Sequence, residues 1–146
     1  MGMISDYAEN KLVDFIFRGQ AWTIPASLYI GLLTAAPGET GGGTEVAGGS
    51  YARVAVTRGL AQWAGTQSAG STTASSGTSA TTSNNTTITF PAHTANWGVV
   101  THWGIYDAST GGNLLFYGSL AQAKTVNNGD AAPSFAPGQL SLQLDN

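Results

Sequence analysis

Apolar and polar residues alternate with a period of two over much of the chain, a pattern typical of β-strands. The clearest case is segment 27–34, in which Leu28, Ile30 and Leu32 share one face. Segment 50–57 repeats the alternation after a long glycine-rich connection. We expect both segments to be strands, with further strands at 60–63, 86–90, 99–106, 114–120 and 140–144.

Residues 6–18 have apolar residues spaced three and four apart, which predicts one N-terminal α-helix. Asp6 followed by Glu9 is typical of a capping box at a helix start. Gly19 is placed to end the helix in the left-handed conformation. Such a helix covers one end of the sheet or reaches a neighbouring subunit. Its apolar stripe consists of Ala8, Leu12, Phe15 and Ile16, widened by Val13 and Phe17.

Two segments between the expected strands are poor in large side chains. Segment 35–49 contains six glycines, and Val46 is its one large apolar residue. A connection of this length without structure of its own is usually functional or mobile, so we expect a flexible loop. Segment 65–85 consists almost entirely of Ser, Thr, Gly, Ala and Asn. It is either a mobile excursion from the sheet or an extended arm ordered by a partner.

Six or seven short strands separated by turn residues predict a mainly β protein. We expect residues 1–146 to form one domain, a jelly-roll-like β-sandwich with one N-terminal α-helix. Segment 107–113, with the sequence DASTGGN, predicts a hairpin loop. Strands and helices do not alternate along the chain, so a parallel nucleotide-binding sheet is not favoured.

Charged residues make up 9% of the chain, against about 25% in an ordinary soluble domain. Segment 59–106 contains no Lys, Arg, Asp or Glu. Such a surface lacks the charge that discourages contact between neighbours. It is either a hydroxyl-rich β-protein surface or the surface of a subunit packed among other subunits.

The composition also argues against several classes of partner. The five basic residues are dispersed and the net charge is −3, so we do not expect nucleic acid as a partner. The chain has no cysteine, which excludes disulfides and thiolate metal sites. No apolar run approaches 18 residues, and the N-terminus does not resemble a signal peptide, so no membrane partner is expected.

Candidate catalytic and metal-binding residues are few. His93 and His102, taken with Asp107, match no metal-ligand spacing, and the turn at 107–113 has too few carboxylates for calcium. Glu39 and Glu45 lie in the expected flexible loop, which does not suit catalytic preorganisation. No nucleophile elbow or phosphate-binding loop is present. We therefore expect no enzyme activity, no cofactor and no metal.

Tryptophans give the sequence one further binding alternative. Trp63, Trp97 and Trp103 offer flat faces on which a sugar ring could stack. Tryptophans on strands more often belong to the core. A glycan-binding module is therefore an alternative carried by these side chains alone.

The order of segments resembles a family of small virion structural proteins of tailed bacteriophages. The similarity covers most of the chain and is weakest at 65–85. Members of that family serve as capsid decoration (cement) proteins or as tail-fibre-associated proteins. The matching segments are DYAENKL (6–12), LYIGLLTAAPGETG (28–41), GGSYARVAV (48–56), FPAHTANWG (90–98), THWGIYDA (101–108) and GNLLFYG (112–118).

The resemblance implies a virion structural protein made in the bacterial host cytoplasm. Our first expectation is a cement protein on the outer capsid surface, which binds the major capsid protein lattice as a homotrimer and stabilises the head. The alternative is a protein associated with the tail, baseplate or tail fibre. In either case we expect the apolar helix and the glycine-rich loop to contact the partner, through Leu12, Phe15, Phe17, Glu39, Thr40, Glu45 and Val46.

Overall fold

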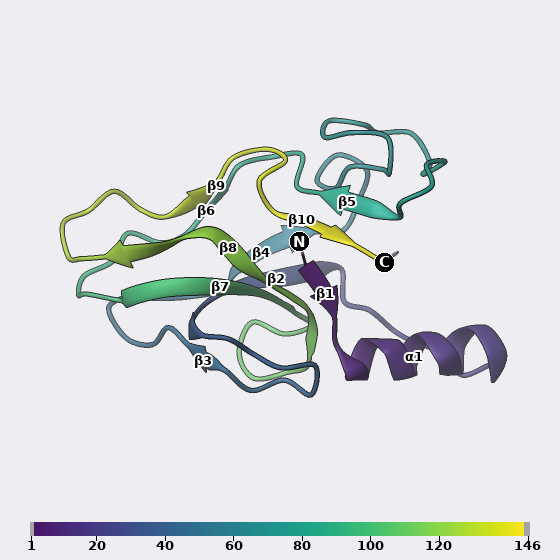
Figure 1. The fold of residues 1–146 in the computed structure, drawn as a ribbon, viewed down its shortest axis with the longest axis horizontal. Coiled ribbons are helices and arrows are strands. Elements are labelled where there is room, and N and C mark those ends of the chain that lie inside the picture. The colour runs from purple at the N-terminus through teal and green to yellow at the C-terminus, as the bar shows by residue number, and fades with distance from the viewer. Residues whose placement is uncertain (1, 145–146) are drawn as a thin grey trace.

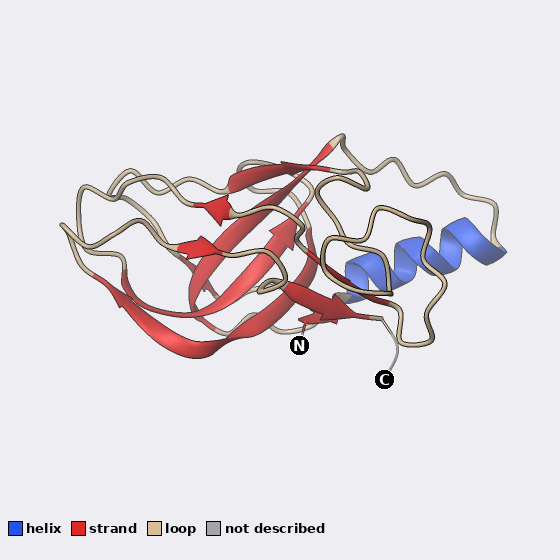
Figure 2. Ribbon diagram, turned by 90° about the horizontal axis from the view of Figure 1, so that it is seen from above, coloured by secondary structure: helices blue, strands red, loops and turns tan. Residues whose placement is uncertain are grey.

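The computed structural model describes residues 2–144, and these form a β-sandwich with one N-terminal helix (Figures 1 and 2). The predicted mainly β class is confirmed, whereas the jelly-roll connectivity stays a prediction. The elements are β1 (Gly2–Ile4), α1 (Asp6–Phe17), β2 (Ser27–Ala35), β3 (Thr44–Glu45), β4 (Val54–Thr57), β5 (Thr81–Ser83), β6 (Ile88–Thr89), β7 (Gly98–Tyr106), β8 (Leu114–Val126), β9 (Ser134–Phe135) and β10 (Ser141–Gln143).

Three long antiparallel strands, β2, β7 and β8, form the centre of the larger sheet, whose order is β3-β2-β7-β8-β1-β10-β5. The strand β4 pairs with β2 outside this path, and β1 pairs with β10 in parallel. Ile30 lies opposite Ile105, and Ile105 lies opposite Phe116. This register gathers the apolar residues of three strands on one face.

The main core lies on that face, under a second layer that includes the small β6–β9 sheet (Figure 1). The two-residue period therefore gave the correct inner face of β2. A smaller cluster on the opposite face consists of Tyr106, Leu114 and Tyr117, with Tyr29 packed against it. The sheet thus carries buried apolar side chains on both faces over its central part.

Most predicted strands are confirmed in position, and one is wrong. Residues 60–63 form a turn, because the backbone N–H groups of Gln62 and Trp63 both donate to the Gly59 carbonyl. Trp63 then makes one isolated bridge to Asn84. Trp63 packs against the core from this turn, whereas Leu60 is 57% exposed, and a short apolar run cannot reveal that difference.

The helix α1 begins one residue earlier than the capping-box prediction placed it. Ser5 is the N-cap: its hydroxyl accepts from the Ala8 N–H at 3.3 Å and donates to the Leu114 carbonyl at 2.5 Å. The assignment of the cap to Asp6 is therefore wrong, because Ser5 also holds the helix start against β8. Gly19 has φ of +66°, so the predicted left-handed end is confirmed.

Both glycine-rich and serine-rich segments fold back on the chain. Segment 35–49 contains β3 and a bridge between Gly38 and Gly41, so its interpretation as a connection without structure of its own is wrong. Segment 65–85 includes β5 and is a compact excursion from the sheet. Within it, the Thr66 side chain accepts from the N–H groups of Ser76 and Gly77.

Candidate interaction surface

A buried arginine closes one end of the sheet. The Arg53 guanidinium donates through Nε and Nη2 to both carboxylate oxygens of Glu45, at 2.8 and 2.7 Å. Its Nη1 donates to the carbonyls of Ala108 and Gly111, each at 2.8 Å. One side chain therefore joins β3, the chain after it and the β7–β8 hairpin loop. We call Arg53, Glu45 and Tyr51 the arginine node.

Tyr51 fills a gap in the hydrogen-bond ladder of β2. The strand β4 pairs with residues 27–30 of β2, and β3 pairs with residues 33–35. Between them, the Leu32 N–H donates to the Tyr51 hydroxyl at 2.8 Å, and that hydroxyl donates to Glu45 Oε1 at 2.8 Å. The hydroxyl thus pairs a backbone N–H that would otherwise be left between two partner strands.

Two glycines make room for this arrangement. The Arg53 guanidinium carbon lies 3.5 Å from the centroid of the Tyr106 ring, a cation–π contact. A Cβ at Gly31 would lie 2.8 Å from Glu45 Oε1, and one at Gly104 would lie 2.8 Å from Tyr106 Cε2. The glycines of β2 and β7 therefore allow the node to lie directly on the sheet.

Burial and charge shift the ionisation of these groups in one direction. Burial raises the pKa of Tyr51 and of Tyr106, and the neighbouring Glu45 carboxylate raises both further. Burial is the largest single influence on Arg53 and lowers its pKa, but the hydrogen bonds to Glu45 and the charges of Glu45, Tyr106 and Tyr51 together outweigh it, so the pKa is raised. The node is therefore a closed ion pair with neutral tyrosines.

This closure bears on the predicted contact set. Glu45 is paired within the node and partly exposed, and Val46 is buried in the main core. Contact of these two residues with a partner stays a prediction. Glu39 and Thr40 are exposed, and the Glu39 carbonyl accepts from the Asp6 N–H at the start of α1. Their contact with a partner stays a prediction.

The helix α1 projects from the sheet, and most of its apolar residues face solvent (Figures 1 and 2). Phe15 is 57% exposed, Ile16 63% and Phe17 79%, whereas Leu12 is half-buried. Ala8 is the residue of the helix that the sheet buries. The alternative in which the stripe covers the end of the sheet is therefore wrong. We call Val13, Phe15, Ile16 and Phe17 the helix face.

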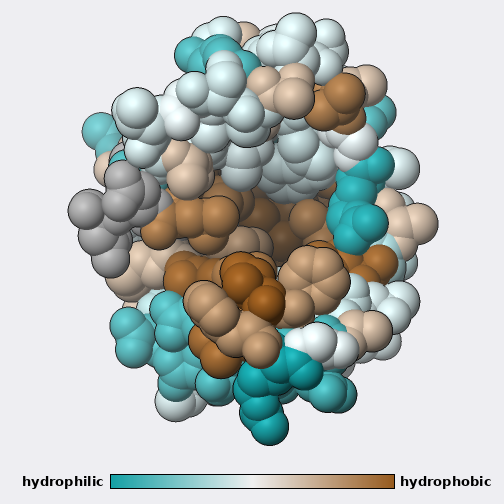
Figure 3. Space-filling view, turned by 90° about the vertical axis from the view of Figure 1, so that its right-hand side faces the viewer, coloured by the Kyte–Doolittle hydropathy of each residue, from teal (hydrophilic) through white to brown (hydrophobic). Residues whose placement is uncertain are grey.

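An apolar hollow of about 240 Å³ opens on the same side of the molecule. Figure 3 shows apolar side chains gathered around it, with paler residues above and hydrophilic residues at the rim. The hollow is the uncovered end of the main core, because Ile105 and Leu142 belong to both. It is lined by Leu28, Trp63, Thr82, Ile105, Phe116, Leu142 and Leu144.

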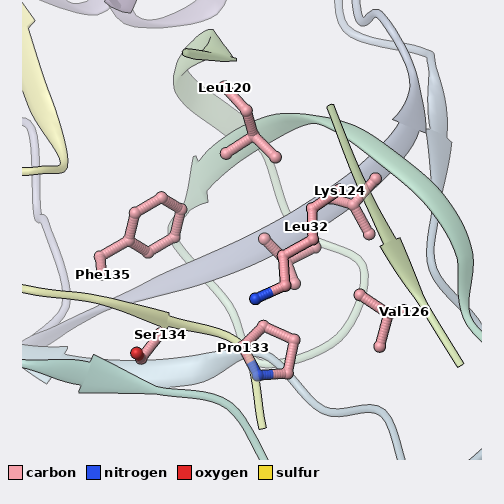
Figure 4. A pocket seen from close by; sticks show the side chains of 8 residues that line it. Leu32, Leu120, Lys124, Val126, Pro133, Ser134 and Phe135 are labelled. Carbon is pink, nitrogen blue, oxygen red and sulfur yellow. The ribbon is translucent and has the colours of Figure 1, made fainter. Parts of the chain in front are cut away.

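A second apolar pocket opens where Leu32, Val126 and Phe135 converge between β2, β8 and β9 (Figure 4). Its volume is about 60 Å³ and its walls are mostly apolar. Exposed Lys124 and Ser134 also line it, so the pocket is open to solvent.

The histidines and Asp107 have structural partners. His93 is buried with Nε2 2.5 Å from the Asn127 carbonyl, and His102 Nδ1 lies 2.8 Å from the Thr101 hydroxyl. The Asp107 carboxylate accepts from both the backbone and the side-chain amide of Asn113. The predicted turn at 107–113 is confirmed. Among residues 2–144, no group of three or more His, Cys, Asp or Glu is placed to hold a metal.

The tryptophans proposed as stacking surfaces for a glycan lie in or against the core. Trp97 and Trp103 are buried in the main core, and Trp63 packs against it. The interpretation of these two strand tryptophans as core residues is therefore confirmed, and the alternative in which their faces are free for stacking is contradicted. The described part of the chain also contains no helix long and apolar enough to cross a membrane.

The arginine node and the hollow were missed from the sequence. The signal available for the node is the position of Arg53 in segment 50–57, where the two-residue period places it on the face opposite Val54 and Val56. The sequence carries no signal for the hollow, because Phe116 and Leu142 have the alternation expected of ordinary core residues on strands.

The comparison with known families agrees with this surface-contact geometry. Residues 3–143 match the model of a family described as Podophage GP4 fiber I protein gp80, which spans nearly the whole chain. No curated protein matches the sequence. The predicted resemblance to tailed-phage virion proteins is confirmed. The chain therefore belongs to the podophage GP4 fiber I protein gp80 family and is a tailed-phage virion structural protein.

Proposed function

We propose that the chain is a fibre-associated component of the virion that acts by protein contact and not by catalysis. The observation that carries this proposal is the family match over residues 3–143, whose printed description names a fibre protein. The exposed helix face supports it, because exposed apolar residues gathered on one side of a protein mark interaction surfaces. The paired carboxylate of the arginine node supports the absence of catalysis.

A second candidate is capsid decoration, in which the chain binds the major capsid protein on the outside of the head. The observation that favours it is the stretch of 59–106 without Lys, Arg, Asp or Glu, which suits close packing among coat subunits. In either location we propose a homotrimer, because several weak contacts made together give avidity. Nucleic acid and membrane are not among the proposed partners.

Localisation separates the two candidates. Virions assembled with and without the chain would be compared by cryo-electron microscopy, and the chain would be marked by a C-terminal tag and gold-labelled antibody. We expect density and label at a fibre. Label spread over the head lattice would overturn the fibre proposal in favour of decoration. A chain lacking residues 6–18 serves as a second sample, and we expect it to be lost from the particle.

A further inference from the structure

The second half of β8 has one edge without a partner strand. The strand β1 pairs with β8 at residues 116–118. On the other edge the ladder with β7 is interrupted, because Thr101 alone stands opposite residues 120–123, which form a large bulge. Among residues 2–144, β7 is the one strand that pairs with β8 over 119–125. An edge of this kind is a template on which another strand can pair.

A groove runs beside this free edge. The bulge of β8 is one wall, and β9 with the turn after it is the other. Buried Leu32 and Val126 belong to its floor, which is therefore apolar. Its wider part has a volume of about 340 Å³, within the range of about 300–1,000 Å³ typical of ligand-binding clefts. This part and the pocket of Figure 4 are continuous, since they share Leu120, Lys124, Ser134 and Phe135.

Lys124 brings a positive charge into the groove. Lys124 and buried Val126 are two residues apart on β8, so both side chains lie on the face of the strand that is turned to the core. In Figure 4 the Lys124 nitrogen lies among the apolar side chains that line the pocket. Neither ion pair of the described residues includes Lys124. A carboxylate that entered the groove would therefore find a free cation.

We propose that the groove binds an extended, acidic peptide segment of a partner protein, which adds to the free edge of β8 and places a carboxylate on Lys124. The strand edge supplies main-chain hydrogen bonds, and the apolar floor receives alternate side chains of the segment. A small organic acid would use Lys124 alone and leave the strand edge without a partner. This contact is separate from the helix face and can operate at either location of the chain on the virion.

Charge distinguishes the acidic segment from a second copy of the chain. Residues 108–129, which contain this edge, include Lys124 but no Asp or Glu. Two copies paired edge to edge would therefore leave both ammonium groups without a carboxylate. An inward-pointing charge and a bulge also discourage pairing with a neutral strand. The same lysine thus disfavours copies and neutral segments, and it favours a segment that carries the opposite charge.

The test is a titration of the isotope-labelled full chain with end-capped heptapeptides, followed by the NMR signals of its backbone amides. In the peptide TVTDTVT, the aspartate and both valines share one strand face. TVTNTVT keeps this shape without the charge, and TVTKTVT reverses the charge. We expect TVTDTVT to reach half-saturation below about 1 mM and to shift the signals of residues 119–125. It should bind about 3–5-fold more tightly than TVTNTVT, the factor expected of a partly exposed ion pair.

Two further samples test the charge and the strand pairing. Lys124→Glu should reverse the order, so that TVTKTVT binds most tightly. Lys11→Glu is the matched control, because Lys11 is the other lysine of the chain and lies on α1. It should keep the order of the natural chain. TVTDTVT would also be methylated on the amides of its threonines or on those of its other residues. One of these two peptides should lose binding, since alternate amides of a strand point to each edge.

Equal binding of TVTDTVT and TVTNTVT, an unchanged order in Lys124→Glu, or no binding at about 1 mM would overturn the proposal. Hexanoate that shifts the same signals at the same concentration would replace the peptide by a small organic acid. Loss of binding by both methylated peptides, or by neither, would contradict strand addition. The peptide comparison uses the natural chain, so it decides the question even if a variant misfolds.

Discussion

The arginine node and the helix face differ in whether their side chains have contact partners within the same chain. At the node, the guanidinium of Arg53 pairs with a carboxylate and two carbonyls of the same chain. At the helix face, the side chains of Phe15 and Phe17 are exposed to solvent and do not pack against a core. The first region has completed its contacts within the chain, and the second has not. We therefore expect stability to be concentrated at the node, and we propose that association occurs at the helix.

The largest effect should follow from removing the centre of the node. Arg53→Met leaves the Glu45 carboxylate without its partner and frees the carbonyls of Ala108 and Gly111. Breaking a buried pair costs about 3–5 kcal/mol, and because Glu45 is partly exposed we expect about 3 kcal/mol. Urea unfolding followed by tryptophan fluorescence would measure it. Arg18→Met, at the exposed pair with Asp14, is the control and should cost less than about 0.5 kcal/mol.

A smaller loss should follow from filling the space beneath the node. In Gly104→Ala the added Cβ would lie 2.8 Å from the Tyr106 ring and 3.0 Å from Leu114 Cδ1, so the ring must move from under Arg53. Overpacking of this kind costs about 1–3 kcal/mol. Gly38→Ala, where the nearest atom is 3.8 Å away, is the matched control. Equal unfolding midpoints for the two variants would contradict the close packing.

The Tyr51 hydroxyl alone should contribute about 1–2 kcal/mol. Tyr51→Phe leaves the Leu32 N–H without a protein partner and removes one of the two hydrogen bonds to Glu45 Oε1. An unpaired buried group carries a cost of this size. The change keeps the ring and its contacts with Phe90 and Trp97. Equilibrium unfolding measures the loss. Tyr7→Phe is the control, since Tyr7 is a half-buried tyrosine on α1. A similar loss of stability in Tyr7→Phe would contradict a specific contribution of the Tyr51 hydroxyl.

Alkaline pH should weaken the node. The pKa values of Tyr51 and Tyr106 are raised in the folded state, so the folded chain keeps protons that the unfolded chain releases above about pH 10. Their contribution is complete below pH 10 and is lost as the pH rises further, by at most about 1.4 kcal/mol per unit and per group. Unfolding free energies between pH 8 and 11 would measure the slope, and Tyr51→Phe should make it shallower.

The smallest effect on folding is expected at the helix face. Phe17→Ser should change the free energy of unfolding of the monomer by less than about 0.5 kcal/mol, since Phe17 is 79% exposed. Thermal unfolding at low concentration would measure it. A loss of more than about 1 kcal/mol under monomeric conditions would mean that the chain itself covers this face, and the contrast with the node would fail.

Local pattern predicted much of the fold correctly. The alternation in 27–34 gave β2 and its inner face, and Gly19 marked the end of α1, because strand period and positive φ are properties of neighbouring residues. The N-cap was missed because Ser5 is selected by a contact with Leu114, 109 residues away. Of the predicted contact residues, Phe15 and Phe17 are exposed, Glu45 is partly exposed and Val46 is buried.

The sequence by itself determined the mainly β class, the single N-terminal helix and the membership in a phage virion family, since each follows from short-range periodicity or from segment order. The tertiary structure decided which apolar faces are covered. A period shows which residues share a face, but it does not show what lies opposite. The pairing of β2 with β7 brings Tyr106 to Arg53. The short second layer leaves the core open beside α1.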